Sequence, residues 1–176
     1  LLKLMKDRTP KYLVVVFDAK GKTFRHYLYE RYKANRPPAP EDLIVQIPYI
    51  KRIVRGLNVK MIEKEGYEAD DVIGTIARHA EERGFSVVVV TGDKDFRQIV
   101  SPNVTLWDTM HDKIMDYGAL KEAYSELEPS QMIDLMGLAG DSSDNVPGVR
   151  GVGEKTALRL IREHGSIEGV YEHLEE

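Results

Sequence analysis

The 176-residue sequence contains no cysteine, which excludes disulfides and thiolate metal sites and fits a reducing, cytoplasmic location. It also has no apolar run close to the roughly 20 residues that a membrane-spanning helix needs. The stretch from Leu1 to Asp7 lacks an initiator Met and is too short and too charged for a secretory signal. With 42% hydrophobic and 31% charged residues, the chain suits one globular domain with a small appended module.

The net charge of −4 argues weakly against a nucleic-acid partner, but the charges are unevenly distributed. Residues 20–36 carry one acid, Glu30, against six cations: Lys20, Lys22, Arg25, Arg31, Lys33 and Arg36. Four aromatic residues lie among them, and such interleaving is typical of segments that grip unpaired strands. A solvated amphipathic helix is the alternative interpretation of this segment.

Hydrophobic periodicity predicts an α/β fold. Residues 12–17 and 86–91 are continuous β-branched runs, and residues 58–62 form a weaker one. From residue 68 onward the apolar spacing predicts a helix that stops near Gly84, and residues 41–56 predict another that Pro48 should kink or restart. The alternation predicts a mostly parallel sheet flanked by helices.

Acidic residues gather in four short clusters: Asp18, Glu68-Ala69-Asp70-Asp71, Asp93-Lys94-Asp95 and Asp141-Ser142-Ser143-Asp144. Asp18 and Asp93 directly follow predicted strands, where open α/β sheets bind ligands. Each cluster alone is more simply explained by a turn or a helix cap. Together they would repel one another strongly unless cations relieved the charge, and oxygen-only ligands favour Mg²⁺ or Mn²⁺. Two such ions can activate water and stabilise the leaving oxygen of a phosphodiester.

A glycine-rich stretch, residues 145–156, follows a predicted short helix over 130–138 and precedes one over 154–164. It fits neither a P-loop nor a dinucleotide fingerprint. We interpret it as a helix–hairpin–helix, in which Gly151 and Gly153 let the backbone approach a phosphate and the next helix points its N-terminus at it. Such a module grips duplex backbone without reading sequence, and a plain tight turn is the alternative.

These motifs together resemble the 5′-nuclease domain of bacterial DNA polymerase I, within the wider flap endonuclease family. The matching stretches are residues 16–25, 32–38, 68–74, 91–95, 140–145 and 151–156. The resemblance implies a PIN-like core over 1–128, with a basic arch segment at 20–40, and a helix–hairpin–helix DNA-binding region over 129–176. It also implies that family members open with a further Asp-bearing strand before the region that matches Leu1.

The same resemblance assigns roles to individual residues. Two Mg²⁺ ions are expected at Asp18, Glu68, Asp70, Asp71, Asp93, Asp95, Asp141 and Asp144, with K⁺ at the hairpin. Lys33 and Arg36 are the expected catalytic cations. The expected DNA-binding residues are Lys20, Lys22, Arg25, Tyr32, Gly148, Arg150, Gly151, Gly153, Lys155 and Thr156.

The expected activity is a structure-specific 5′-3′ exonuclease or flap endonuclease acting on 5′-flapped or branched DNA and on RNA primers, with a polymerase domain in the parent protein. Two alternatives stay open at this point. Without the first strand, the chain could bind DNA junctions but not cut them. It could also be a metal-dependent phosphohydrolase or ribonuclease, although a duplex clamp argues against a small-molecule enzyme.

Overall fold

A computed structural model describes residues 1–174 of the chain. The chain divides into two compact units, and each is described by itself. The first comprises Leu1–Tyr27 and Pro37–Val72, and the second comprises Leu28–Arg36 and the chain from Ile73 onward. The basic segment predicted over 20–40 therefore contributes to both units.

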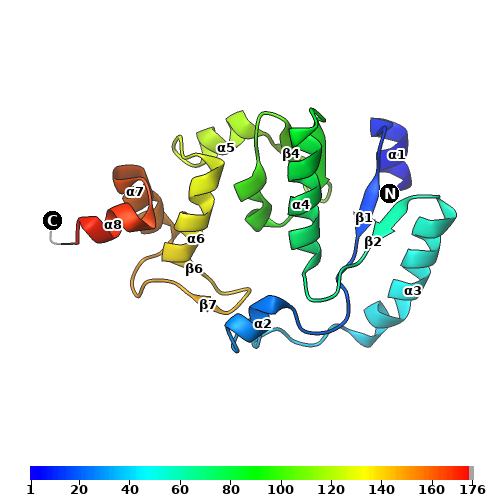
Figure 1. Ribbon diagram of the computed structural model, residues 1–176, viewed down its shortest axis with the longest axis horizontal. Helices are drawn as coiled ribbons and strands as arrows, with labels where there is room; N and C mark the ends of the chain where they lie inside the picture. The colour runs from blue at the N-terminus through cyan, green and yellow to red at the C-terminus, as the bar shows by residue number, and fades with distance from the viewer. Residues whose placement is uncertain (175–176) are drawn as a thin grey trace. The chain divides into compact units, whose positions relative to one another are not determined.

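The first unit is built on a pair of parallel strands. Its elements are α1 (Leu2–Arg8), β1 (Val14–Val16), α2 (Phe24–Leu28, which reaches into the second unit), α3 (Glu41–Gly56) and β2 (Lys60–Ile62). Strands β1 and β2 pair in parallel, with Val15 opposite Met61, and α3 runs beside them (Figure 1). Lys51 on α3 forms a 2.7 Å salt bridge with Glu63, which follows β2, and this fixes the helix to the end of that strand.

Helix α3 corrects one expectation. The sequence predicted that Pro48 would kink or restart the helix, and the restart is wrong, because a single helix runs through Pro48 from Glu41 to Gly56. Proline removes one main-chain hydrogen bond from a helix interior, at a cost of about 3 kcal/mol. Two features favour this helix: Glu41 and Asp42 complement the dipole of its first turn, and Val54 is buried near its other end.

The second unit contains a three-stranded sheet. The first residues of α4 (Ala69–Glu82) belong to the first unit, and the rest of this helix belongs to the second. The elements that follow are β3 (Val87–Val90), η1 (Lys94–Ile99), β4 (Val104–Asp108), β5 (Lys113–Met115) and α5 (Tyr117–Ala123). Strands β3 and β4 are parallel, and β4 and β5 form an antiparallel hairpin. The turn at Gly84, with a positive φ of 78°, follows α4 as the sequence predicted.

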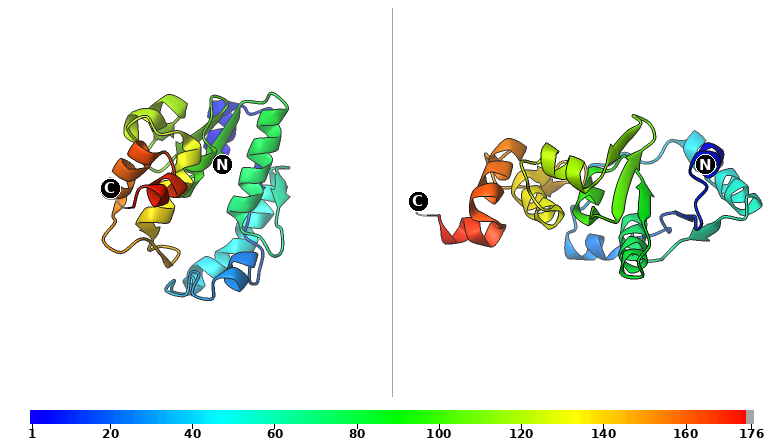
Figure 2. Two further views of the ribbon diagram at one scale, coloured as in Figure 1. Left: turned by 60° about the vertical axis from the view of Figure 1, so that its left-hand side comes forward. Right: turned by 90° about the horizontal axis from the view of Figure 1, so that it is seen from above.

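The C-terminal part of this unit is mainly helical. Its elements are η2 (Pro129–Gln131), α6 (Met132–Ala139), β6 (Gly140–Asp141), β7 (Val146–Pro147), α7 (Glu154–His164) and α8 (Ile167–Glu172). Figure 2 shows α7 and α8 lying beside α6 in both views. Helix α7 has the predicted bounds and stops at Gly165, whose φ is 85°.

One hydrophobic core spans the second unit. Val104 and Leu106 on β4 pack with Ala77 on α4, Leu120 on α5 and Ile161 on α7. Leu120, Ala157 and Ile161 are completely buried, so the C-terminal helices share one core with the β3–β4–β5 sheet. The loops that follow β3 and β6 are therefore attached to the same packed scaffold.

The predicted α/β class is confirmed, with helices accompanying parallel strand pairs. The strands hydrogen-bond as three separate sheets instead of the single one that the sequence predicted, because strand alternation indicates parallel pairing but not which strands share an edge. No helix within residues 1–174 combines the length and apolar character needed to cross a bilayer.

Candidate active site

The loop after β3 places two carboxylates at the carboxyl end of the sheet. The Asp93 main-chain N–H donates to Oγ1 of Thr91 at 3.0 Å, which holds the turn. The Asp93 side chain in turn accepts a 2.9 Å bond from the Asp95 N–H and caps η1. This local geometry explains why acids follow this strand, and it fixes Asp93 and Asp95 on one short turn.

Asp95 is a partly buried carboxylate in the middle of this acidic cluster. Its Oδ1 atom is buried and accepts no hydrogen bond within the described residues. Burial raises the pKa of Asp95 above its ordinary value, and the negative charges of Asp93, Asp141 and Asp144 raise it further. An unsatisfied carboxylate oxygen surrounded by other carboxylates is the environment in which a cation would be stabilised.

Asp141 lies on β6 at the edge of this cluster. Burial acts to raise the pKa of Asp141, but the Ser143 N–H bond of 2.7 Å and the Lys94 ammonium, 3.5 Å from Oδ2, outweigh it and lower the pKa. Asp141 is therefore ionised in the metal-free protein. Lys94 lies between Asp93 and Asp95 in the sequence, so η1 and its N-cap residue together supply two acids and a cation.

Asp144 is held by three side chains of the basic segment. The Tyr32 hydroxyl donates to Oδ2 at 2.8 Å, and the Arg36 guanidinium donates to Oδ1 at 2.5 Å. The Lys33 ammonium lies 3.8 Å from Oδ2. The two predicted catalytic cations and the predicted DNA-contacting tyrosine thus converge on one predicted metal ligand.

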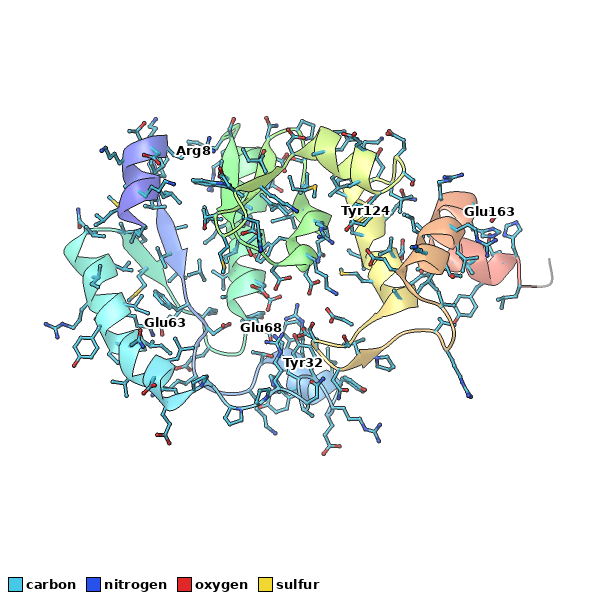
Figure 3. All side chains as sticks on the ribbon, turned by 180° about the vertical axis from the view of Figure 1, so that it is seen from behind. Arg8, Tyr32, Glu63, Glu68, Tyr124 and Glu163 are labelled. Atoms are coloured by element: carbon cyan, nitrogen blue, oxygen red, sulfur yellow. The ribbon has the colours of Figure 1, made fainter. Side chains whose placement is uncertain are left out.

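Main-chain contacts also fix the basic segment on the loop between β6 and β7. The Asn35 amide donates to the Ser142 carbonyl at 2.8 Å, and the Asn145 amide donates to the Arg31 carbonyl at 2.7 Å. Figure 3 shows Tyr32 beside this loop. Asn35 and Asn145 were not among the predicted site residues, because an asparagine in a loop gives no signal that it will bind a distant main chain.

The first unit carries the other predicted acids. Asp18, at the end of β1, accepts a 2.8 Å bond from the Ala69 N–H and so caps the start of α4. Asp71 forms a two-pronged pair with the Arg25 guanidinium, at 2.7 and 2.8 Å, and accepts a 3.0 Å bond from the Glu68 N–H. A predicted DNA-binding residue, Arg25, is therefore paired with a predicted metal ligand.

The remaining predicted residues of the first unit differ in exposure. Glu68 is only 7% exposed, which is unusual for a carboxylate, and its burial fits a role beyond surface charge. Asp70, Lys20 and Lys22 are exposed. These three side chains are therefore accessible to solvent and to charged partners.

The predicted hairpin has two kinds of glycine. A Cβ at Gly148 would meet the Ala139 carbonyl carbon and the Gly140 nitrogen at 2.4 Å, so this glycine permits close packing of two main-chain segments. Gly151 and Gly153 face open space, and Gly151 has a φ of 82°. Arg150 and Lys155 are exposed beside them, and Thr156 is half-buried in the first turn of α7.

The acids of the second unit suit hard divalent cations, because their donors are all carboxylate oxygens. Among residues 1–174, however, no three His, Asp or Glu side chains stand close enough to hold a metal ion as they are placed. The single site of eight carboxylates therefore stays a prediction. Four of the eight carboxylates influence one another electrostatically, because the negative charges of Asp93, Asp141 and Asp144 raise the pKa of Asp95.

Two family models match the chain along nearly its whole length. Residues 1–125 match the family model of the 5′-3′ exonuclease N-terminal resolvase-like domain. Residues 127–176 match that of the 5′-3′ exonuclease C-terminal SAM fold. The two models together cover nearly the whole chain.

Two relatives illustrate the range of matching proteins. The chain is 45% identical to DNA polymerase I of Rhizobium leguminosarum over 183 residues, covering 100% of this chain and 18% of the polymerase. It is 42% identical to a 5′-3′ exonuclease of Aquifex aeolicus over 175 residues, covering 99% of this chain and 60% of that protein. The chain thus spans less than two thirds of the length of either relative.

Solved structures support the same assignment. The T5 D15 protein, co-crystallised with metal ions, matches with a TM-score of 0.84 and 25% identity, over 97% of this chain and 68% of that one. The catalytic core of Rad2 in complex with DNA matches with a TM-score of 0.58 and 19% identity, over 89% of this chain and 49% of that one, and shares the fold alone. By its sequence, across both of its parts, the chain belongs to the 5′-3′ exonuclease family.

Proposed function

We propose that this chain is the nuclease part of a structure-specific 5′-3′ exonuclease or flap endonuclease that hydrolyses phosphodiesters of DNA or of an RNA primer. The observation that carries the proposal is the Asp95 carboxylate. Its Oδ1 atom is buried without a hydrogen bond within the described residues, and three other carboxylates raise its pKa. A structural Asp would be expected to find a donor, whereas a metal ligand keeps an oxygen available.

We propose that Asp93, Asp95, Asp141 and Asp144 hold divalent cations, with Mg²⁺ or Mn²⁺ as the physiological ions. Asp18, Glu68, Asp70 and Asp71 are proposed to complete a two-ion site. When bound, two such ions supply an activated water and stabilise the leaving oxygen of an in-line displacement. The crystals of the related T5 D15 protein with metal ions support this assignment.

Lys33 and Arg36 are proposed to bind the phosphate at the cleavage point. Both cations contact Asp144 in the metal-free protein. If Asp144 held a cation, Lys33 and Arg36 would lie beside it and would offer positive charge to the phosphate oxygens, where negative charge grows during hydrolysis. Tyr32, which is 7% exposed and bonded to Asp144, would position the segment that carries them.

The hairpin and the basic segment are proposed to hold the DNA. Gly151, Gly153 and the start of α7 offer main-chain N–H groups to a phosphate of the duplex, with K⁺ as an accompanying ion. Arg150, Lys155 and Thr156 of the hairpin are proposed to contact the DNA backbone, as are Lys20, Lys22 and Arg25 of the basic segment. A 5′-flapped or branched DNA is the proposed substrate, a polymerase domain is the proposed neighbour in the parent protein, and the bacterial cytoplasm is the proposed location.

The test is cleavage of a duplex with a 5′-labelled flap in Mg²⁺ or Mn²⁺, with EDTA and the Asp93→Asn variant as controls. Short labelled products are expected with either ion and are expected to vanish in both controls, while the variant still binds DNA. Asp112→Asn is a matched variant, because Asp112 lies in the β4–β5 turn, where it accepts a hydrogen bond from Trp107. It should leave cleavage unchanged.

Two results would contradict the proposal. Junction binding without product at any metal concentration would make the chain a DNA-binding module. Turnover of a small phosphate ester without activity on DNA would make it a phosphohydrolase.

A further inference from the structure

A small pocket opens in the second unit next to the acidic cluster. Its volume is about 180 Å³, and η1, the end of α5 and one face of α6 form its walls. This volume is below the roughly 300–1,000 Å³ of pockets that take drug-sized ligands, so it suits a single ring system. Lys94, at its rim, is also the cation that lies 3.5 Å from Asp141.

The side chains of the pocket form a stacking surface. In a 3₁₀-helix, positions i and i+3 eclipse, so Lys94 and Arg97 project from the same face of η1. The Arg97 guanidinium lies over the Tyr124 ring, 5.3 Å from its centroid. Figure 3 shows Tyr124 where α5 leads toward α6. Arg97 makes no salt bridge within the described residues, so no carboxylate competes with a ligand for the guanidinium face that is turned away from Tyr124.

The floor of the pocket is apolar. Met132 and Leu135 are 3% and 5% exposed, and Met136 lies beside them. Thioether groups adapt to flat rings and make favourable contacts with them. Burial raises the pKa of the Tyr124 phenol, so the ring is neutral and its hydroxyl can donate a hydrogen bond at physiological pH.

We propose that this pocket binds one unpaired nucleobase of the nucleic acid whose phosphate is cleaved. A flat, uncharged, aromatic ligand matches the Arg97–Tyr124 surface and the methionine floor. Glu154 lines the pocket, which disfavours a phosphate inside it and offers an acceptor to an exocyclic amine. Lys94 binds the adjacent phosphate at the rim.

The inference rests on the proposed function, because it places the base next to a phosphate at the Asp141 side of the site. It adds a contact that holds the substrate by one base near the cleavage point. Stacking accepts any base, so the pocket would fix position on the strand and not sequence.

The experiment pairs base removal with protein variants. Flap substrates that each lack one base, at successive positions around the cleavage point, are bound to the wild-type chain in EDTA, where no cleavage occurs. Binding is measured by fluorescence anisotropy. The same series is repeated with Tyr124→Leu, with Arg97→Gln and with Tyr49→Leu, a tyrosine on α3 that is 59% exposed and outside the pocket.

One position is expected at which loss of the base weakens wild-type binding by at least about fivefold, as for a base that stacks on an aromatic ring. Tyr124→Leu should bind the complete substrate more weakly than wild type by a similar factor. Its affinity should not fall further when that base is absent. Arg97→Gln should show the same pattern, which keeps the test informative if Tyr124→Leu folds poorly. Tyr49→Leu should behave as wild type.

The proposal is overturned if, at every position, removal of the base changes the DNA affinity of both pocket variants by the same factor as that of the wild type. Because binding is measured without metal, that result would say nothing against cleavage by the wild-type chain. Absence of cleavage by the wild-type chain in Mg²⁺ or Mn²⁺ would instead count against the proposed function.

Discussion

The Tyr32 hydroxyl donates a 2.8 Å hydrogen bond to Oδ2 of Asp144, a residue 112 positions later in the chain. The same carboxylate binds Arg36 and lies close to Lys33, so one acid is surrounded by a phenol and two cations. In the metal-free protein these groups neutralise a proposed ligand. The arrangement therefore couples the position of the basic segment to the charge of Asp144.

Tyr32→Phe should lower the free energy of unfolding by about 1 to 2 kcal/mol, because it removes a buried hydrogen bond to a charged group. Urea denaturation measures the loss, and hydrogen exchange should show faster opening of residues 28–36. Tyr29→Phe is the matched control, since the Tyr29 hydroxyl makes no side-chain hydrogen bond among residues 1–174. Equal stability of the two variants would contradict the assigned role of Tyr32.

Asp95→Asn should stabilise the metal-free protein, and the gain should grow with pH. The pKa of Asp95 in the folded chain is raised above its ordinary value of 3.8, so the folded chain binds that proton more tightly than the unfolded chain. The stability that the protonated Asp95 contributes is therefore fully present below pH 3.8 and is lost as the pH rises through the pKa that Asp95 has in the folded chain. Urea denaturation in EDTA from pH 4 to 7 measures the difference between variant and wild type. A variant that is less stable than wild type by a constant amount would refute this account.

Arg25 and Asp71 should show a coupling free energy of about 0.5 to 1 kcal/mol in a double-mutant cycle with Arg25→Met and Asp71→Asn. The two-pronged geometry favours the upper end of this range, whereas the Arg25 side chain is 34% exposed, which weakens the pair through solvent screening. Thermal or urea unfolding of the four proteins measures it. Strict additivity would show that the pair does not hold α2 against the start of α4.

Gly148→Ala should destabilise the chain by at least about 1 to 3 kcal/mol, because the added methyl group meets main-chain atoms at 2.4 Å. Gly153→Ala should cost less, at most about 1 kcal/mol for the loss of glycine at the N-cap of α7, because its Cβ would face open space and its φ of −95° suits any residue. If Gly153 approaches a DNA phosphate, its substitution should instead weaken duplex binding. Reversed effects on stability would contradict the placement of the hairpin.

Much of the fold could be predicted from local sequence patterns. The valine runs of β1 and β3, the apolar spacing of α4 and the glycine after α7 each determine their element through neighbouring residues. The motif resemblance also gave the correct family, which both family models confirm. Strands β6 and β7 were missed because two-residue strands are too short to show a period.

The site was less predictable, because its contacts join distant parts of the chain. The sequence placed Arg25 among DNA contacts and Asp71 among metal ligands, but it contained no sign that they pair across 46 residues. Likewise, Asp95 Oδ1 is buried without a hydrogen bond because of the packing around η1, and this packing cannot be predicted from neighbouring residues in the sequence. A restart at Pro48 was expected because a propensity rule was applied without the rest of its helix.

The central claim is that the acids around Asp95 bind divalent cations, and calorimetric titration of the metal-free chain with Mn²⁺ or Mg²⁺ tests it most directly. Wild type is expected to bind with a measurable heat, and Asp95→Asn is expected to bind at least about tenfold more weakly, as for a charged ligand that loses its charge. Equal affinity in wild type and Asp95→Asn would show that the buried oxygen of Asp95 serves no cation.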